Sequence, residues 1–275
     1  MNLKTDFLKI VEEIRKSKPV IHHLTNYVSA ESCADICLAA GASPIMADAI
    51  EEVKDIAKNA DAVVINIGTI STEQMEAINT AVVVAKEQGI PVIFDPVGVM
   101  SSQYKLHFAL ELLQKGLVDI VRCNLSECLA LVSGKAVGRG LDNTADASDN
   151  VGLKAAKEGA KMFNCIFAVT GAVDFVSDRK HAVVLNNGNP LLKDITGAGC
   201  MTSTLVACCA SVADDMLTAA ALGVVIMGQS SELAANFLEK KDGPGMFKAR
   251  LMDAVYHVTT KFNVLNLEPN KVKND

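Results

Sequence analysis

Apolar runs alternate with segments of helical periodicity along the first 170 residues. Each run is short and rich in β-branched residues, which is typical of a strand that is buried on both faces. The predicted strands are Val20–Leu24, Val63–Ile67, Pro91–Phe94, Asp119–Arg122 and Ile166–Thr170. The predicted helices between them are Glu31–Ala40, Glu73–Gln88, Leu106–Lys115 and Gly152–Phe163. This pattern predicts an α/β fold whose central, mostly parallel sheet carries helices on both faces.

The pattern changes after Thr170. Phe175–Ser177 and His181–Leu185 flank a polar turn, which predicts an antiparallel hairpin at the edge of the sheet. Three further helices are predicted over Met201–Val212, Met216–Glu239 and Phe247–Phe262. The polar final segment, Glu268–Asp275, predicts a frayed end. Because no stretch has the composition of a linker, we expect residues 1–275 to form a single domain.

Composition and charge exclude several partners. Half of the 275 residues are apolar, and 26 Lys and Arg face 32 Asp and Glu, so the chain lacks the positive surplus that a nucleic-acid backbone requires. The most apolar stretches, Thr204–Ala213 and Thr218–Gly228, fall short of the roughly 20 residues that span a bilayer. We therefore expect buried core helices there and a protein without nucleic-acid or membrane partners.

The cysteines and the N-terminus indicate a cytoplasmic protein. The eight cysteines include no Cys-x-x-Cys pair, which favours small core side chains in a reducing compartment over a zinc or redox site. The segment Met1–Pro19 is amphipathic and has no continuous apolar region before a cleavage site, so we expect a helix there, not a signal peptide.

Polar residues and glycines gather where the predicted strands end. These turns contain Thr25-Asn26, Gly68-Thr69, Asp95-Pro96-Val97-Gly98, Cys123-Asn124 and Thr170-Gly171. Since right-handed crossovers bring the carboxyl ends of parallel strands to one edge of the sheet, and ligands bind at that edge, the turns predict a functional site.

The segment Asp194–Met201 carries the sharpest local signal. Gly197 and Gly199 stand directly before a long apolar helix, where a glycine lets the backbone approach a ligand and the first N–H groups lack partners. This arrangement favours an anion site at the positive end of the helix. An ordinary tight turn explains the glycines equally well, so the motif alone leaves both interpretations open.

Two carboxylates are expected at the same edge. Asp95 follows a predicted strand and Glu127 opens the helix after Asn124, so both are candidates to hold a hydrated Mg²⁺ against phosphates. Each has a structural alternative, because Asp95 can cap the turn at Pro96 and Asn124 with Glu127 has capping-box spacing. Their coincidence with the Gly-rich turn is what favours a site.

The other candidates have structural alternatives of the same kind. Met46 suits a flexible wall for an aromatic ligand or a core position, and Asn26 suits a ligand contact or a turn. His22 and His23 lack a third ligand at metal spacing, so we interpret them as one buried strand histidine and one solvent-facing neighbour, with a substrate or interface role as the lesser alternative.

Seven blocks in order resemble the hydroxyethylthiazole kinase family of the ribokinase-like superfamily over essentially the whole chain. The blocks are His22-His23-Leu24-Thr25-Asn26, Pro44-Ile45-Met46-Ala47 with Glu51-Glu52, Asn66-Ile67-Gly68-Thr69, Asp95-Pro96-Val97-Gly98, Arg122-x-Asn124-x-Ser126-Glu127, Val169-Thr170-Gly171 and Thr196-Gly197-Ala198-Gly199-Cys200-Met201. Cys200 closes the Gly-Ala-Gly turn where sugar kinases of the superfamily carry aspartate. That feature makes the resemblance specific.

The resemblance implies a reaction and a set of partners. It implies a ribokinase-like fold, ATP as co-substrate, Mg²⁺ as cofactor and transfer of a phosphoryl group to the hydroxyl of 4-methyl-5-(2-hydroxyethyl)thiazole, a step of thiamine salvage. It also implies a homotrimer with active sites between subunits. It places the acceptor at Asn26, Met46 and Gly197, ATP at Arg122, Thr170 and Asn124, and Mg²⁺ and phosphate at Asp95 and Glu127.

General chemistry gives these residues roles. Phosphoryl transfer depends mainly on positioning and on neutralising charge, so the N–H groups of Gly197, Ala198, Gly199 and Cys200 are expected to hold the γ-phosphoryl. Cys200 would stand beside the attacking hydroxyl. A helix N-terminus lowers a thiol pKa while the charge of ATP opposes thiolate formation, so we expect a modest base or a positioning group. The structural alternative is a small residue that seals the helix start.

Two departures from the family pattern and two alternative functions remain. Family members usually carry glycine at the position of Cys123 and Gly-Ala-Thr where this chain has Met100-Ser101-Ser102.

The first alternative function is another ribokinase-like enzyme, a vitamin or pyrimidine kinase, with the same phosphate machinery. The second is a non-catalytic sensor of nucleotide or thiazole. Mg²⁺-dependent ADP release with the thiazole alcohol distinguishes all three.

Overall fold

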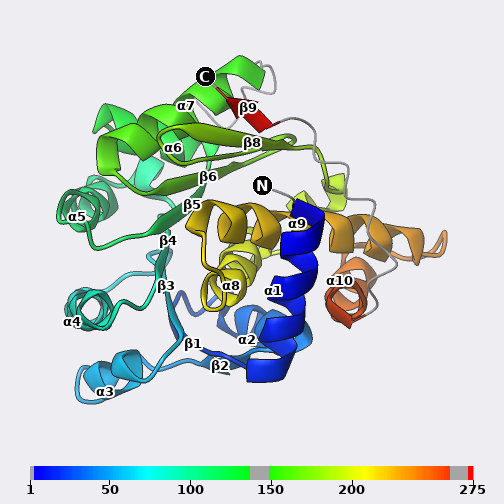
Figure 1. Cartoon of the computed structure of the whole chain (residues 1–275), viewed down its shortest axis with the longest axis horizontal. Helices are drawn as coiled ribbons and strands as arrows, with labels where there is room; N and C mark the ends of the chain where they lie inside the picture. Colours follow the sequence, from blue (N-terminus) through cyan, green and yellow to red (C-terminus); the bar gives the residue numbers. More distant parts are fainter. Residues whose placement is uncertain (1–2, 137–148, 261–271, 275) are drawn as a thin grey trace.

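The computed structural model describes residues 3–136, 149–260 and 272–274. Its centre is one nine-stranded sheet with the order β2-β1-β3-β4-β5-β6-β7-β8-β9 (Figure 1). The strands are β1 (Val20–Leu24), β2 (Ser43–Ile45), β3 (Ala62–Asn66), β4 (Val92–Asp95), β5 (Ile120–Asn124), β6 (Ile166–Thr170), β7 (Asp174–Ser177), β8 (His181–Leu185) and β9 (Val272–Asn274). Strands β1 to β6 are parallel, and β7, β8 and β9 join them antiparallel.

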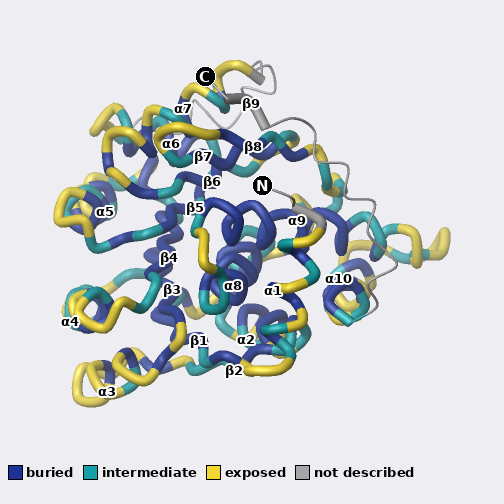
Figure 2. Tube along the Cα trace, in the orientation of Figure 1, coloured by how far each residue is buried: buried dark blue, intermediate teal, exposed yellow. Residues whose placement is uncertain are grey.

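Two helical layers cover the sheet, as the pattern of apolar strands predicts (Figure 1). One layer holds α1 (Leu3–Ser17), α2 (Ala30–Ala40), α8 (Ala198–Ala210), α9 (Met216–Asn236) and α10 (Pro244–Thr260), and its side chains form one hydrophobic core. The other holds α3 (Val53–Lys58), α4 (Thr72–Gln88), α5 (Gln103–Gln114), α6 (Leu125–Ser133) and α7 (Asp149–Phe163), which form the second core. Figure 2 shows the strands as a buried band between the layers.

The register of the central strands sets the site. Asn66 is the partner of Asp95, and Asn124 is the partner of Thr170. Because Phe94 pairs with Val121, the ends of β5 and β6 extend beyond those of β3 and β4. The backbone at these ends turns away from the sheet because helix caps follow closely. Asn124, for example, accepts a hydrogen bond from the N–H of Glu127 and begins α6.

Most predicted elements are confirmed, with boundaries that shift by a few residues. The hairpin of β7 and β8, the N-terminal helix and the helices after residue 196 are all present. The predicted end of the last helix, Phe262, lies outside the described residues. Strand β2 and helix α3 were not predicted, because each is too short for a periodic pattern.

Two expectations were wrong. His22 and His23 are both buried, since helices cover both faces of β1 and leave neither side for solvent. Val272–Asn274 pairs with β8, so the predicted frayed end is a strand there, and its other residues lie outside the described part. The expected buried helix is confirmed at α9. It is the one described helix long and apolar enough to cross a membrane, and 83% of its apolar window is buried inside the protein.

Candidate active site

The Asn66 side chain lies at the centre of a buried polar network. Its Nδ2 donates to Asp95 Oδ2 at 3.0 Å, and its Oδ1 accepts from Asn26 Nδ2 at 2.9 Å and from the N–H of Gly68 at 2.9 Å. Ser203 of α8 donates a second hydrogen bond to Asp95 Oδ2 at 2.9 Å. The network therefore joins the ends of β1, β3 and β4 to α8.

The Cys200 sulfur is the point where this network meets the first turn of α8. It accepts from Asn66 Nδ2 at 3.2 Å and from Asn26 Nδ2 at 3.4 Å. Burial, followed by the nearby Asp95 carboxylate, raises the pKa of the thiol, whereas hydrogen bonds with Ser29 and Asn26 and the charge of Arg122 act in the opposite direction. The other seven cysteines are buried, and Cys200 is the one of intermediate exposure.

Asp95 forms a buried ion pair with Arg122. The distance from Asp95 Oδ1 to Arg122 Nη1 is 3.6 Å, and this oxygen accepts no hydrogen bond. Burial raises the pKa of Asp95, while Arg122 acts in the opposite direction. Arg122 also donates from Nη2 to Thr170 Oγ1 at 2.6 Å, which aims the guanidinium along the edge of the sheet.

Glu127 brings a second buried carboxyl close to Asp95. It accepts from the N–H of Gly98 at 3.1 Å and from that of Asn124 at 2.9 Å, which completes the capping box that its spacing predicts. Burial, and then the charge of Asp95, raises the pKa of Glu127 to about 7. Both carboxyls are buried, and the charge of Asp95 opposes the ionisation of Glu127, so a cation beside them would be stabilising.

The carboxyls fit an ion that binds together with phosphates. Asp95 Oδ1 is an orphaned buried acceptor, and each Glu127 oxygen keeps a second lone pair beyond its backbone hydrogen bond. The described residues contain no group of three or more His, Cys, Asp or Glu that would hold a metal alone. Mg²⁺ is commonly bound by one or two carboxylates with phosphates and water supplying the rest, so the donor set suits it.

The turn before α8 has the backbone that its glycines predict. Gly197 has a φ of +85°, in the left-handed region that favours glycine, and a Cβ there would lie 3.0 Å from Ser29 Cβ. A Cβ on Gly199 would overlap Arg122 Nη1. The two glycines therefore let the positive end of α8 and the guanidinium of Arg122 lie against each other, which is the setting of an anion site.

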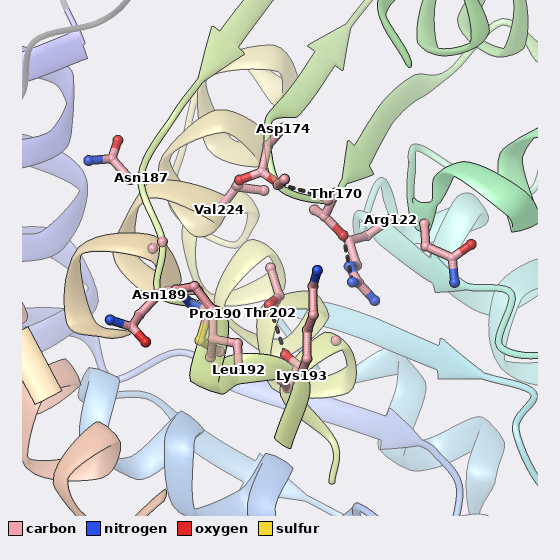
Figure 3. A pocket seen from close by; sticks show the side chains of 18 residues that line it. Arg122, Thr170, Asp174, Asn187, Asn189, Pro190, Leu192, Lys193, Thr202 and Val224 are labelled. Atoms are coloured by element: carbon pink, nitrogen blue, oxygen red, sulfur yellow. Dashed lines mark hydrogen bonds between the residues drawn. The ribbon is translucent and has the colours of Figure 1, made fainter. Parts of the chain in front are cut away.

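A cavity of about 430 Å³ opens beside this turn (Figure 3). Its wall includes three predicted ATP residues and two of the predicted phosphate-binding glycine-turn residues, namely Arg122, Asn124, Thr170, Ala198 and Gly199. The rest of the wall comes from the β6–β7 turn, the segment from residue 187 to 193 and the middle of α9. The volume suits a nucleotide.

Met46 lies apart from the polar network. It directly follows the edge strand β2, its side chain is 40% exposed, and it belongs to neither hydrophobic core. His22 fixes the neighbouring backbone, because its Nε2 lies 2.6 Å from the carbonyl oxygen of Ala47. The structure thus brings Asn26, Cys200 and Asp95 together. It leaves Met46 on the surface, directly before Ala47, the residue that His22 contacts.

Sequence reasoning assigned no role to four polar residues at this edge: Asn66, Lys105, Asp174 and Ser203. Lys105 reaches from α5 to the carbonyl oxygen of Gly68 at 2.6 Å, and burial lowers its pKa. Asn66 begins the block Asn66-Ile67-Gly68-Thr69 but carries no charge to attract notice. The other three stand inside or beside regular elements, where nothing in the local pattern separates them from surface or capping residues.

The two departures from the family pattern place Cys123 and Met100 inside the protein, while Ser101 is exposed and Ser102 half-buried. Cys123 is buried in β5 with its side chain in the second core, on the strand that carries Arg122. Met100 is buried in the short 3₁₀ helix Val99–Ser101, and Ser102 caps α5 by accepting from the N–H of Lys105 at 3.3 Å. Neither departure removes a charge from the site.

Comparison with known proteins agrees with this geometry. The family model described as "Hydroxyethylthiazole kinase family" matches residues 11–261. A hydroxyethylthiazole kinase of Ruminiclostridium cellulolyticum is 41% identical over 248 residues, which is 90% of each chain. One of Clostridium beijerinckii is 38% identical over 269 residues, covering 96% of this chain and 95% of that protein.

Solved structures extend the likeness to the fold. A hydroxyethylthiazole kinase protein from Pyrococcus horikoshii superposes with a TM-score of 0.86 at 33% identity, covering 98% of both chains. A ribokinase-like superfamily protein from Enterococcus faecalis superposes with a TM-score of 0.64 at 12% identity over 93% of this chain, which shows the ribokinase-like fold alone. The model match and the identities over most of the chain show that this protein belongs to the hydroxyethylthiazole kinase family.

Proposed function

We propose that this protein is a kinase that transfers the γ-phosphoryl group of ATP to the hydroxyl of 4-methyl-5-(2-hydroxyethyl)thiazole. The products are the phosphorylated thiazole and ADP, and the role is thiamine salvage. The observation that carries the proposal is the cavity of about 430 Å³ that runs to the first turn of α8, where Arg122 and the Asn66 network meet. The names of its relatives support the acceptor.

The phosphates of ATP lie against the positive end of α8. The N–H groups from Gly197 to Cys200 point toward the γ-phosphoryl, and Arg122 supplies a planar set of donors held by Thr170. These donors neutralise charge on the transferring group, which is the main requirement of a loose transition state. Asn124 lines the same cavity at the start of α6.

The acceptor alcohol lies on the Cys200 side of the turn. Asn26 and Gly197 contact it, and Met46 closes the pocket as a flexible wall. Cys200 is a modest base or positioning group for the hydroxyl, because its raised pKa keeps it a thiol near neutrality. The proton of the alcohol then leaves to the phosphoryl group or to water, with Cys200 orienting the oxygen.

Asp95 and Glu127 hold Mg²⁺ in this proposal. Bound Mg²⁺ supplies charge neutralisation at the phosphate oxygens. The orphaned oxygen of Asp95 and the raised pKa values of both buried carboxyls support this assignment. Arg122 balances Asp95 when no cation is bound, which keeps the buried carboxylate in place.

The assembly, the domain organisation and the location complete the proposal. We propose a homotrimer with active sites between subunits, which gives the exposed Met46 side chain a partner surface at each site. The described strands form one continuous sheet, which supports a single domain over residues 1–275. A cytoplasmic location agrees with eight unpaired cysteines.

A coupled ADP-release assay tests the function. The protein is incubated with ATP and Mg²⁺ and with the thiazole alcohol, hydroxymethylpyrimidine, pyridoxal or ribose in parallel. We expect turnover with the thiazole alcohol, and none when Mg²⁺ is removed by chelation. Turnover with a different alcohol would favour another ribokinase-like kinase, and binding without any turnover would favour a sensor.

A further inference from the structure

A buried carboxyl forms part of the wall of the nucleotide cavity. Asp174 is the first residue of β7, and its side chain is only 7% exposed. In Figure 3 it lies between Thr170 and Val224, whereas Lys193 enters from the opposite side of the view. Nothing in the proposed transfer of the phosphoryl group uses Asp174.

One oxygen of Asp174 has a structural partner and the other does not. Oδ1 accepts a hydrogen bond from the N–H of Gly171 at 2.9 Å, which closes the β6–β7 turn. Within the described part of the chain, no donor reaches Oδ2. Asp174 as a residue is buried, but Oδ2 stays open to the cavity, so a ligand that offers a donor there can take the place of water.

The charges around the cavity indicate which part of a nucleotide meets this oxygen. Among the described residues that line the cavity, Asp174 is the one acid. Arg122 and the first turn of α8 mark the end of the cavity where the phosphates are proposed to bind. Arg122 is close enough to act against the raised pKa of Asp174, so the carboxyl lies near the phosphate end. Because a carboxylate repels phosphate, we expect it to meet the adjoining nucleoside half of the nucleotide. The donors of that half are the ribose hydroxyls and the amino group of the base.

Capping the β6–β7 turn does not require a carboxylate. The side-chain oxygen of an asparagine would accept from the N–H of Gly171 equally well and would not bury a charge. Burial raises the pKa of Asp174 to about 7, which shows that the surroundings oppose the charge. Compared with an asparagine, the carboxyl adds a second acceptor oxygen at the cavity wall.

We propose that Asp174 determines nucleotide specificity by accepting a hydrogen bond from a hydroxyl or amino donor of the nucleoside half of the bound nucleotide. This inference rests on the proposed function, because it takes a nucleotide as the ligand of the cavity. The ribose hydroxyls and the base amino group share the same chemistry, and they are distinguished by analogues that lack one donor at a time.

The test measures binding of ADP, 2′-deoxy-ADP, 3′-deoxy-ADP and IDP by isothermal titration calorimetry at pH 8. The proteins are wild type, Asp174→Asn and the control Asp178→Asn, which changes an acid of the β7–β8 turn outside the cavity wall. We expect wild type and the control to bind one analogue roughly 10- to 100-fold more weakly than ADP, as loss of a charged hydrogen bond implies. In Asp174→Asn that ratio should fall to within about threefold.

The arms of the experiment have separate meanings. If the preference for ADP over a deoxy analogue is lost in Asp174→Asn, Asp174 accepts from a ribose hydroxyl. If the preference for ADP over IDP is lost, Asp174 accepts from the amino group of the base. If every ratio is the same in wild type and Asp174→Asn, Asp174 only caps the turn and the inference is wrong while the proposed function stands. If wild type binds no ADP, the proposed function itself fails. Asp174→Ser provides the same comparison if the asparagine variant does not fold.

Discussion

Asn66 Nδ2 donates a hydrogen bond to Asp95 Oδ2 over 3.0 Å, and the two residues are also register partners at the ends of β3 and β4. The same nitrogen lies 3.2 Å from Cys200 Sγ. One amide therefore sets the distance between a buried carboxylate and the thiol at the start of α8. A rigid sheet edge holds this geometry more closely than a loop would, because both backbones are fixed by the ladder.

Replacing Asn66 by Ala removes this connection. Asp95 keeps the hydrogen bond from Ser203 but loses one of its two donors, so we expect kcat to fall roughly 10- to 100-fold while the KM for ATP stays within about threefold. Steady-state kinetics with both substrates measures the split. Asn59→Ala is the control, because Asn59 is exposed at the end of α3. Equal losses in kcat and in ATP binding would contradict a positioning role.

Replacing Asp95 by Asn tests the buried charge. The variant leaves Arg122 without its partner, so we expect the free energy of unfolding to fall by about 3 kcal/mol and kcat to fall by more than roughly 100-fold. Urea denaturation and kinetics at saturating Mg²⁺ give the two values. The exposed acid Asp253, 3.6 Å from Arg250, serves as the control, and Asp253→Asn should change stability by less than about 1 kcal/mol. Unchanged kcat in Asp95→Asn would remove Asp95 from the chemistry.

Adding one methyl group at Gly199 should displace Arg122. The new Cβ would overlap the guanidinium, so Gly199→Ala should raise the KM for ATP at least about tenfold with a smaller effect on the KM for the thiazole alcohol. Gly245→Ala is matched to it, since a Cβ on this helix-start glycine meets no atom within 4 Å. An ATP KM that is equal in the two variants would show that Arg122 does not bind the nucleotide from its present position.

The layered fold could be predicted from the sequence because its signal is local. Strands β3, β4 and β6 are apolar up to their last residue, and α6 begins at a capping box formed by Asn124 and Glu127. Elements without enough residues for a period, such as α3, gave no signal. The sheet order is also non-local, since β2 pairs on the outer side of β1 although β3 follows it in sequence.

The candidate site divides in the same way. Asp95, Glu127 and Gly197 could be predicted from charge or from backbone freedom at strand ends. Asn66 and Asp174 could not, because their roles depend on what lies across the sheet: the register partner of Asn66 and the cavity beside Asp174. The burial of both His22 and His23 was missed for the same reason.

Replacing Cys200 should leave measurable turnover. Its thiol pKa is raised by burial and by Asp95, so little thiolate exists near neutrality and the side chain serves mainly to orient the alcohol. We expect Cys200→Ala to retain roughly 1–10% of wild-type kcat, a smaller loss than that of a strong general base. Cys209→Ala, on the buried side of the same helix, is the control for packing. Complete inactivity in a folded Cys200→Ala protein would show that the thiol is the base.

The stability of the protein should depend on pH through Asp174. Its folded-state pKa, raised to about 7 by burial, lies above the unfolded value of 3.8, so the folded state holds an extra proton between those limits. Stability therefore falls as pH rises through this window, because the unfolded chain ionises the group more readily. Asp174→Asn lacks this loss, and we expect its stability relative to wild type to be higher at pH 8 than at pH 5.

Urea denaturation of the ligand-free proteins at pH 5 and pH 8 measures this difference. Asp178→Asn should behave oppositely. Burial acts against the charge of Asp178, but hydrogen bonds from His181 and Lys180 outweigh it and lower the pKa of Asp178. Its replacement therefore removes a stabilising charge at both pH values. A relative stability of Asp174→Asn that does not change with pH would mean that the carboxyl ionises freely in the folded protein. The burial argument for a ligand-facing oxygen would then lose its basis, because a well-solvated carboxylate needs no donor from a nucleotide.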